Sequence, residues 1–353
     1  MNIMLDKIST LEGNLPIALS PYVNIFGGDW VTKSSASHSA FWKELLETAH
    51  FRDGDILVPQ DSVGAGGMDL EHLAEWSQAY RDAVDNCGKD IKFWSNCEIF
   101  VQPKEPEKLW PSDGVDYWAS APTNRMVKQF EIVSEYVDRI ITFAAPHYLS
   151  PYNAVPGYYN SYKNYLETGE IETTKPTPPD KFRTLKTTVE GKEVLTIYWS
   201  GMYDNVGVHR VNIYKDGELL TYRVAGRQEK KLINYYPNNF YDETFDLEND
   251  SATYEFEVID CSGNVSERSS FTVEKGSVPN NVKLDKAYTG PVTVKEESNV
   301  SDTVSEEVSN ASDEVSEDPV NLRLIAALTA SVLAVAAVVV VICKRFGKNK
   351  KGN

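Results

Sequence analysis

The chain has 353 residues, which is long enough for about two domains with substantial cores. Its formal net charge of −17 argues against a nucleic-acid-binding surface, so we expect no nucleic-acid partner. Four cysteines without metal-ligand spacing and five scattered histidines indicate no metal site, and no sequence motif indicates a cofactor.

The N-terminal lead-in, residues 1–14, lacks the pattern of a secretory signal peptide, because charged residues follow Met1–Leu5 at once. Four strand-and-helix units then fill residues 15–170, the pattern of a parallel α/β sheet. We expect strands at 15–22, 55–61, 92–100 and 139–148, and helices at 41–49, 69–86, 123–137 and 153–167. The glycine-rich stretch 63–67 lacks the spacing of a nucleotide-binding loop and predicts a flexible lip over a strand end.

Polar side chains stand at the carboxyl ends of these expected strands. Trp94, Asn96 and Glu98 alternate along one strand and therefore share a face. The carboxyl ends of parallel strands meet on one rim, where α/β barrels carry their chemistry. We predict two catalytic carboxylates on this rim, Glu98 and Asp61. The predicted substrate-binding residues are Tyr22, Gln60, Trp94, Asn96, His147 and Tyr148.

Two carboxylates on one rim are typical of glycosidases. One carboxylic acid protonates the leaving oxygen and the other attacks or activates water, at carboxyl separations of about 5–10 Å. Aromatic side chains near the rim offer flat apolar faces that suit sugar rings. The alternative is structural: Glu98 belongs to an ion pair, Asp61 caps the following loop, and the aromatic side chains fill a core.

Several stretches carry a family resemblance, namely 20–22, 58–65, 93–100 and the helix with Arg125 and Gln129. They resemble bacterial glycoside-hydrolase-like (β/α)₈ barrel domains of unknown function, over about residues 15–165. The resemblance implies a partial TIM-type barrel that holds the last four strands. It places Glu98 on the seventh strand, the position of the nucleophile in many retaining glycosidases, and implies that the half carrying the acid is absent.

A different pattern follows a proline-rich linker at 171–180. Short alternating strands are expected at 194–199, 209–215, 252–260 and 270–273, with a hairpin turn at Asp216-Gly217. Trp199 and the stretches 213–217 and 254–266 resemble a fibronectin type III domain over residues 181–275. That resemblance implies an all-β sandwich that serves as a spacer or accessory without catalytic residues.

The C-terminal part has two compositional segments and a tail. Residues 276–321 are predicted to be a disordered acidic stalk, because a loose Val-Ser-Glu repeat cannot bury enough apolar surface to fold. Residues 322–343 are predicted to be a transmembrane helix, since about 20 uncharged apolar residues span a bilayer. The basic tail 344–353 predicts a cytoplasmic C-terminus, with the bulk of a single-pass cell-membrane protein outside.

These patterns together predict a membrane-anchored, extracellular, glycoside-hydrolase-like protein whose partners are carbohydrate and, through the C-terminal helix, the membrane. The alternative is a non-enzymatic glycan-binding or adhesion module at the cell surface, so enzymatic activity stays open. Because export requires a signal and a half barrel exposes two sheet edges, we also expect an N-terminally truncated copy. A dimer that closes the barrel and an independently stable open sheet are the alternatives.

Overall fold

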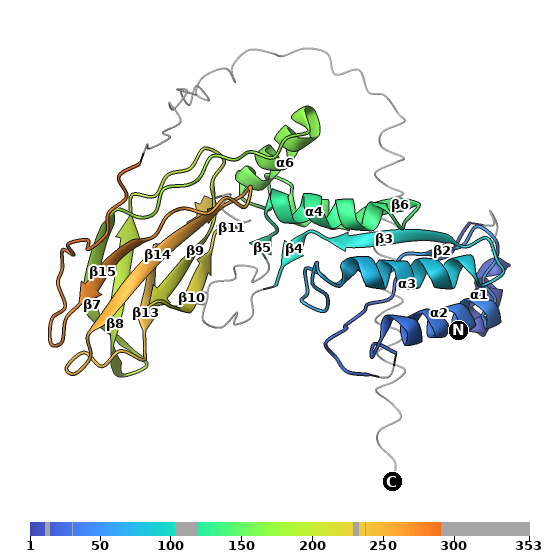
Figure 1. The fold of residues 1–353 in the computed structure, drawn as a ribbon, viewed down its shortest axis with the longest axis horizontal. Coiled ribbons are helices and arrows are strands. Elements are labelled where there is room, and N and C mark those ends of the chain that lie inside the picture. Colours follow the sequence, from blue (N-terminus) through green and yellow to red (C-terminus); the bar gives the residue numbers. More distant parts are fainter. Residues whose placement is uncertain (11–14, 30, 103–118, 229–232, 237, 291–353) are drawn as a thin grey trace, which may run out of the picture. The chain divides into compact units, whose positions relative to one another are not determined.

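The computed structural model describes residues 1–10, 15–29, 31–102, 119–228, 233–236 and 238–290. Its first part is a four-stranded parallel sheet in the order β1-β2-β3-β6 (Figure 1). The strands are β1 (Ala18–Leu19), β2 (Ile56–Leu57), β3 (Lys92–Glu98) and β6 (Arg139–Phe143). In the described residues this sheet is open, with β1 and β6 at its edges.

Helices accompany this sheet and supply much of its core. They are α1 (Asn2–Ser9), α2 (Ser35–Thr48), α3 (Leu73–Asp85), α4 (Thr123–Ser134), α5 (Ala145–Tyr148) and α6 (Pro156–Thr168). A shared core joins Trp42 of α2, Tyr80 and Val84 of α3, and Phe93 of β3. In Figure 1, α3 and α4 run alongside β3. Each buried side chain of this size contributes about 1.5–3 kcal/mol, which fixes the helices on the sheet.

Helix α2 begins with a reciprocal capping pair. The Ser34 hydroxyl accepts the Ser37 N–H at 3.1 Å, and the Ser37 hydroxyl accepts the Ser34 N–H at 3.3 Å. We expect Ser34→Ala to lower the free energy of unfolding by about 1 kcal/mol, because a backbone donor loses its acceptor. Urea unfolding measures this, with Lys33→Ala at an exposed neighbouring position as the control. Equal losses in both variants would contradict the cap.

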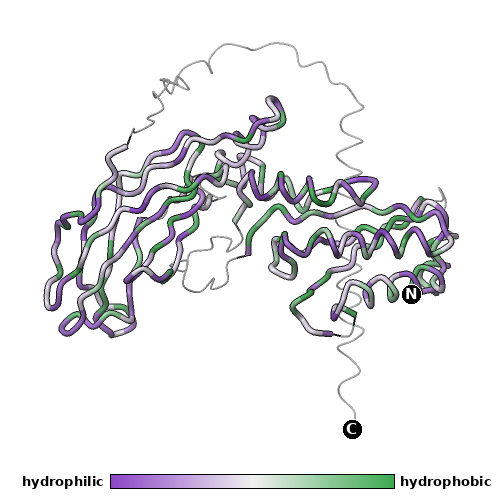
Figure 2. The backbone as a smooth tube through the Cα atoms, in the orientation of Figure 1, coloured by the Kyte–Doolittle hydropathy of each residue, from purple (hydrophilic) through white to green (hydrophobic). Residues whose placement is uncertain are grey.

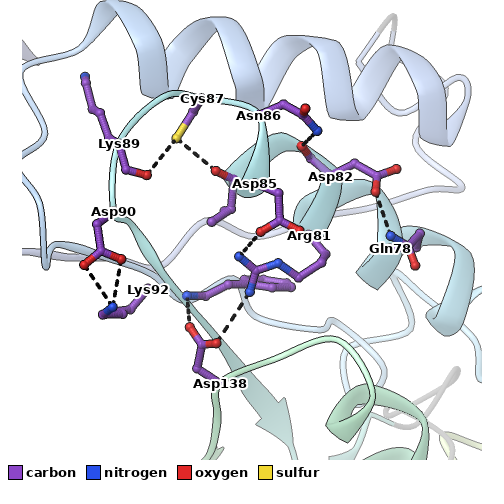
Figure 3. A network of polar contacts seen from close by, with 12 residues as sticks. Gln78, Arg81, Asp82, Asp85, Asn86, Cys87, Lys89, Asp90, Lys92 and Asp138 are labelled. Carbon is purple, nitrogen blue, oxygen red and sulfur yellow. Dashed lines mark hydrogen bonds and ion pairs between the residues drawn. The ribbon is translucent and has the colours of Figure 1, made fainter.

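A polar network fixes the amino ends of β3 and β6 (Figure 3). The Asp138 carboxylate accepts the Phe93 N–H at 2.9 Å, and the Asp138 N–H donates to the Phe93 carbonyl at 2.7 Å. Arg81 of α3 pairs with Asp85 and lies 3.5 Å from Asp138, while Lys92 pairs with Asp90 at 2.8 Å. These contacts stabilise the amino ends of β3 and β6, at the end of the sheet opposite to the carboxyl ends of its strands.

The second part holds two antiparallel sheets over one core. One sheet has the order β13-β8-β7 and the other β10-β9-β14-β15. Leu195 and Ile197 of β8 pack with Val211 of β9, Phe256 of β14 and Phe271 of β15. Figure 2 shows hydrophilic and hydrophobic residues intermixed along these strands, as alternation requires. The strands are β7 (Lys181–Val189), β8 (Lys192–Ser200), β9 (Val208–Lys215), β10 (Glu218–Val224), β13 (Asn239–Asp242), β14 (Ala252–Asp260) and β15 (Ser269–Val273).

Two short antiparallel pairs complete the described strands. One joins β4 (Phe100–Val101) to β5 (Ala119–Ser120), and the other joins β11 (Gly226–Gln228) to β12 (Ile233–Tyr235). The first pair follows β3 directly, so it extends the chain beyond the carboxyl end of the parallel sheet.

The fold class predicted from the sequence is corrected. The described residues form a mixed α/β structure with several sheets, and the predicted membrane helix is not among their elements. No helix in the described part of the chain is both long and apolar enough to cross a bilayer. The predicted single-pass membrane topology and cell-membrane localisation are therefore not supported. The segment 322–343, which was assigned to that helix, lies outside the described residues, as do 291–321 and the tail 344–353.

Candidate functional site

The carboxyl ends of the first three parallel strands meet side by side. Past the ends of β1 and β2, Tyr22 bridges to Gln60, and Gln60 bridges to Asn96 of β3. The Gln60 N–H donates to the Pro21 carbonyl at 2.8 Å, and the Asn96 N–H donates to the Pro59 carbonyl at 2.9 Å. Three of the predicted binding residues are therefore neighbours on one rim.

Asp61 lies directly after this rim and is fully engaged in hydrogen bonds. Its Oδ1 accepts the Glu98 N–H at 3.0 Å and the Val63 N–H at 3.3 Å. Its Oδ2 accepts the side-chain amide of Gln129 on α4. Burial raises the pKa of Asp61, although these hydrogen bonds oppose the rise. A carboxylate with both oxygens occupied holds two strand ends and a helix together.

Glu98, the last residue of β3, is 2 % exposed. Its Oε2 accepts the Ala65 N–H at 2.7 Å. Burial raises the pKa of Glu98 to about 7; the charge of Asp61 adds to the rise, while the Ala65 N–H and Arg125 oppose it. Near neutral pH this carboxyl group therefore exists in both protonation states, as a group that transfers protons must.

The turn 62–67 covers Glu98 closely. A Cβ at Gly64 would lie 2.7 Å from the Phe100 carbonyl oxygen and 2.8 Å from the Glu98 Cβ, so only glycine fits there. The Gly67 N–H donates to the Ser62 carbonyl at 2.9 Å, and the Gln102 N–H donates to the Gly64 carbonyl at 2.9 Å. The glycine-rich stretch is thus a hydrogen-bonded cover over the Glu98 side chain.

Helix α4 supplies two residues that sequence reasoning did not assign to the site. Arg125 donates to the Glu98 carbonyl at 2.8 Å, to the Phe100 carbonyl at 2.5 Å and to the Gln129 Oε1 at 2.7 Å. Gln129 is fully buried and donates to Asp61. Burial lowers the pKa of Arg125 to about 10, which leaves it charged at neutral pH. The available signal was a cation and an amide at helical spacing among apolar residues.

Aromatic side chains gather on the sheet face that turns away from the core of α2 and α3. Tyr22 is 50 % exposed and Phe143 is 47 % exposed, while Trp94 is half-buried. The Arg139 guanidinium lies 4.9 Å from the centre of the Trp94 ring, so one face of that indole is already covered. Burial and the charge of Glu98 raise the pKa of Tyr22, which keeps its phenol neutral.

The two residues predicted at the end of the fourth strand lie in a short helix and not in a strand. The chain after β6 turns into α5, which carries both His147 and Tyr148. Tyr148 is 7 % exposed and its ring lies 5.2 Å from that of Phe100, so it packs in a core. His147 is exposed and, among the described residues, is not part of the network that joins Asp61 to Glu98.

The chemistry available here is proton transfer within a network of carboxyl, amide and guanidinium groups. In the described part of the chain, no group of three or more His, Cys, Asp and Glu side chains is arranged to hold a metal ion.

One family model matches the N-terminal part of the chain. It is described as a domain of unknown function, DUF4434, and it matches residues 1–155. No curated protein matches the chain. Among solved structures, the Clostridium perfringens spore cortex lytic enzyme SleM aligns at 13 % identity and a TM-score of 0.20, covering 72 % of this chain and 97 % of that chain.

Two further solved structures align in the same range. The M60 catalytic domain from Clostridium perfringens ZmpC, in complex with the sialyl T antigen, aligns at 12 % identity and a TM-score of 0.21, covering 75 % of this chain and 39 % of that chain. Chitinase ChiA74 from Bacillus thuringiensis aligns at 11 % identity and a TM-score of 0.20, covering 77 % of this chain and 67 % of that chain. At these TM-scores the alignments establish neither a shared fold nor a shared function, and they give no evidence for a fibronectin type III domain in this chain.

Proposed function

We propose that the chain acts on carbohydrate at the rim formed by Tyr22, Gln60 and Asn96, with Glu98 as the general acid. The observation that carries this proposal is the Glu98 carboxyl group, buried at the end of a parallel strand with a pKa of about 7. A carboxylic acid that retains its proton near neutral pH can donate it to a leaving oxygen. Residues 15–170 form the carbohydrate-active unit in this proposal, and residues 181–275 form an accessory unit.

The proposed reaction is hydrolysis of a glycosidic bond. Glu98 donates its proton to the glycosidic oxygen as the bond from that oxygen to the anomeric carbon breaks. Water then attacks the anomeric carbon, and the proton that this water loses returns to the Glu98 carboxylate. The amides of Gln60 and Asn96 suit hydrogen bonds to sugar hydroxyl groups, and the exposed ring of Tyr22 suits the apolar face of a sugar. Because Glu98 is 2 % exposed, the turn 62–67 has to move before substrate reaches it.

Asp61 has a different part in this proposal. Its three hydrogen-bond donors occupy both carboxylate oxygens, which supports a positioning role toward Glu98 rather than attack on substrate. It holds the backbone N–H of Glu98 itself, so its loss would displace the acid.

The pH dependence tests the role of Glu98. We expect hydrolysis to fall as pH rises through about 7, because Glu98 then loses the proton that it must donate. Release of reducing ends from a panel of plant, bacterial and host glycans, measured from pH 4 to 9 with the full chain, gives the profile. A wild-type rate that rises across this range would contradict a Glu98 acid.

The second candidate is glycan binding without hydrolysis. It is favoured because both carboxylate oxygens of Asp61 already accept hydrogen bonds from the protein. Glu98 is then left without the second reactive carboxylate that the sequence predicted. Isothermal titration with the same glycans separates the two functions. Binding without release of reducing ends would support this second candidate, and neither binding nor hydrolysis would contradict both.

A further inference from the structure

The amino end of α4 is held by a turn that belongs to the antiparallel sheets. The Thr123 N–H donates to the Cys261 carbonyl at 3.0 Å, and the Asn124 N–H donates to the Ser262 carbonyl at 3.0 Å. The first N–H groups of a helix have no partner within it, and the N-cap of α4 is Pro122, which makes no side-chain cap. Residues 260–264, at the end of β14, thus provide the cap that α4 lacks.

The turn 260–264 and the first turn of α4 are in close contact. Gly263 has φ +98°, and a Cβ there would lie 2.1 Å from the Asn124 Oδ1. The Asn124 side chain donates to the Gly263 carbonyl at 3.3 Å. Nearby, the hydroxyl groups of Ser161 on α6 and Ser262 are hydrogen-bonded at 2.7 Å and are buried. A side chain added at Gly263 must displace the Asn124 side chain, which then loses its hydrogen bond to the Gly263 carbonyl at the first turn of α4.

The helix held in this way also holds the candidate acid. Arg125 directly follows Asn124 and donates to the Glu98 carbonyl, and Gln129, one turn further on, donates to Asp61. Asp61 in turn accepts the Glu98 N–H. A continuous set of hydrogen bonds therefore runs from the turn 260–264 through α4 to both backbone polar groups of Glu98.

We infer that the turn 260–264 is a positioning element of the Glu98 site, so that the antiparallel sheets act on the chemistry of the parallel sheet instead of serving only as an accessory. The catalytic meaning of this inference rests on the proposed function. The positional part is independent of it, because it concerns the environment of Glu98 whether or not glycan is hydrolysed. Loosening the turn admits water to Glu98, and its pKa then falls toward the ordinary value, since burial is the main cause of its elevation.

Two glycines provide a matched test. Gly263→Ala and Gly217→Ala both introduce a Cβ at positive φ, +98° and +88°, but a Cβ at Gly217 meets nothing within 4 Å. Both variants carry the same kind of backbone strain, and only the first pushes on Asn124. The Glu98 carboxyl pKa is measured by carbon-13 NMR titration in the full chain, together with hydrogen exchange of the Gln129 side-chain amide.

In Gly263→Ala we expect the Glu98 pKa to fall by about one unit and the Gln129 amide to exchange about tenfold faster, while Gly217→Ala matches the wild type. An unchanged Glu98 pKa in folded Gly263→Ala, or equal shifts in both variants, would overturn the inference. If Gly263→Ala does not fold, Ser262→Ala takes its place, with a smaller shift expected in the same direction and no shift overturning the inference. A wild-type protein without glycan activity contradicts the proposed function alone, because the pKa comparison needs no substrate.

Discussion

Replacing Glu98 with Gln should lower glycan hydrolysis by about 10²–10⁴-fold and should at the same time make the protein more stable at pH 8. Activity falls because an amide cannot donate the required proton. Stability rises because the neutral amide occupies the buried position without the cost of desolvating a carboxylate, while its oxygen can still accept the Ala65 N–H.

The pH dependence of this stability gain follows from the elevated pKa. Folded Glu98 has a pKa of about 7, against an ordinary value of 4.5. Between these values the folded state retains a proton that the unfolded state has lost, so stability decreases as pH rises through this interval and is constant above it. We expect Glu98→Gln to be near neutral for stability at pH 4 and stabilising by about 1–3 kcal/mol at pH 8.

Urea unfolding at pH 4, 6 and 8 measures this difference, with Glu131→Gln on the exposed side of α4 as the control. If Glu98→Gln loses activity without the pH-dependent gain in stability, Glu98 is not a buried carboxylic acid that keeps its proton in the folded state. A gain without loss of activity would place the acid elsewhere.

Replacing Asp61 with Asn should be the most destabilising of the substitutions considered, by about 2–4 kcal/mol. The new side chain can still accept the N–H groups of Glu98 and Val63 through its oxygen. Its amide nitrogen then faces the amide nitrogen of Gln129, which cannot turn around without losing its bond from Arg125. Two buried donors are left opposite each other, and denaturant unfolding measures the loss.

A second substitution should restore this contact. In Asp61→Asn combined with Gln129→Glu, the carboxylate introduced on α4 accepts from Arg125 and from the amide introduced on the rim, so each donor again has an acceptor. We expect the double variant to regain at least half of the stability that Asp61→Asn loses. Gln129→Glu alone should be destabilising, because two carboxylates then face each other. Additive losses in the double-mutant cycle would contradict the network.

The sequence predicted local features well where one residue pattern decides them. The parallel strands begin near the expected positions because short apolar runs bounded by turn signals favour strands. The alternation in β14 directly specifies which residues enter the core. Strands β7, β10 and β13 were not predicted. Several of their buried positions hold polar residues, namely Thr184, Arg223 and Asp242, so the apolar alternation that predicts a strand is weaker there.

The sequence by itself determined that polar residues follow several parallel strands, because strand ends and side-chain alternation are local properties. Only the tertiary structure decided what each of these residues does. In the tertiary structure, both carboxylate oxygens of Asp61 accept hydrogen bonds, Glu98 is buried under the turn 62–67, and Tyr148 packs in a core. Arg125 and Gln129 reach the site because α4 packs across β3, a contact between segments far apart in the chain that no local pattern encodes.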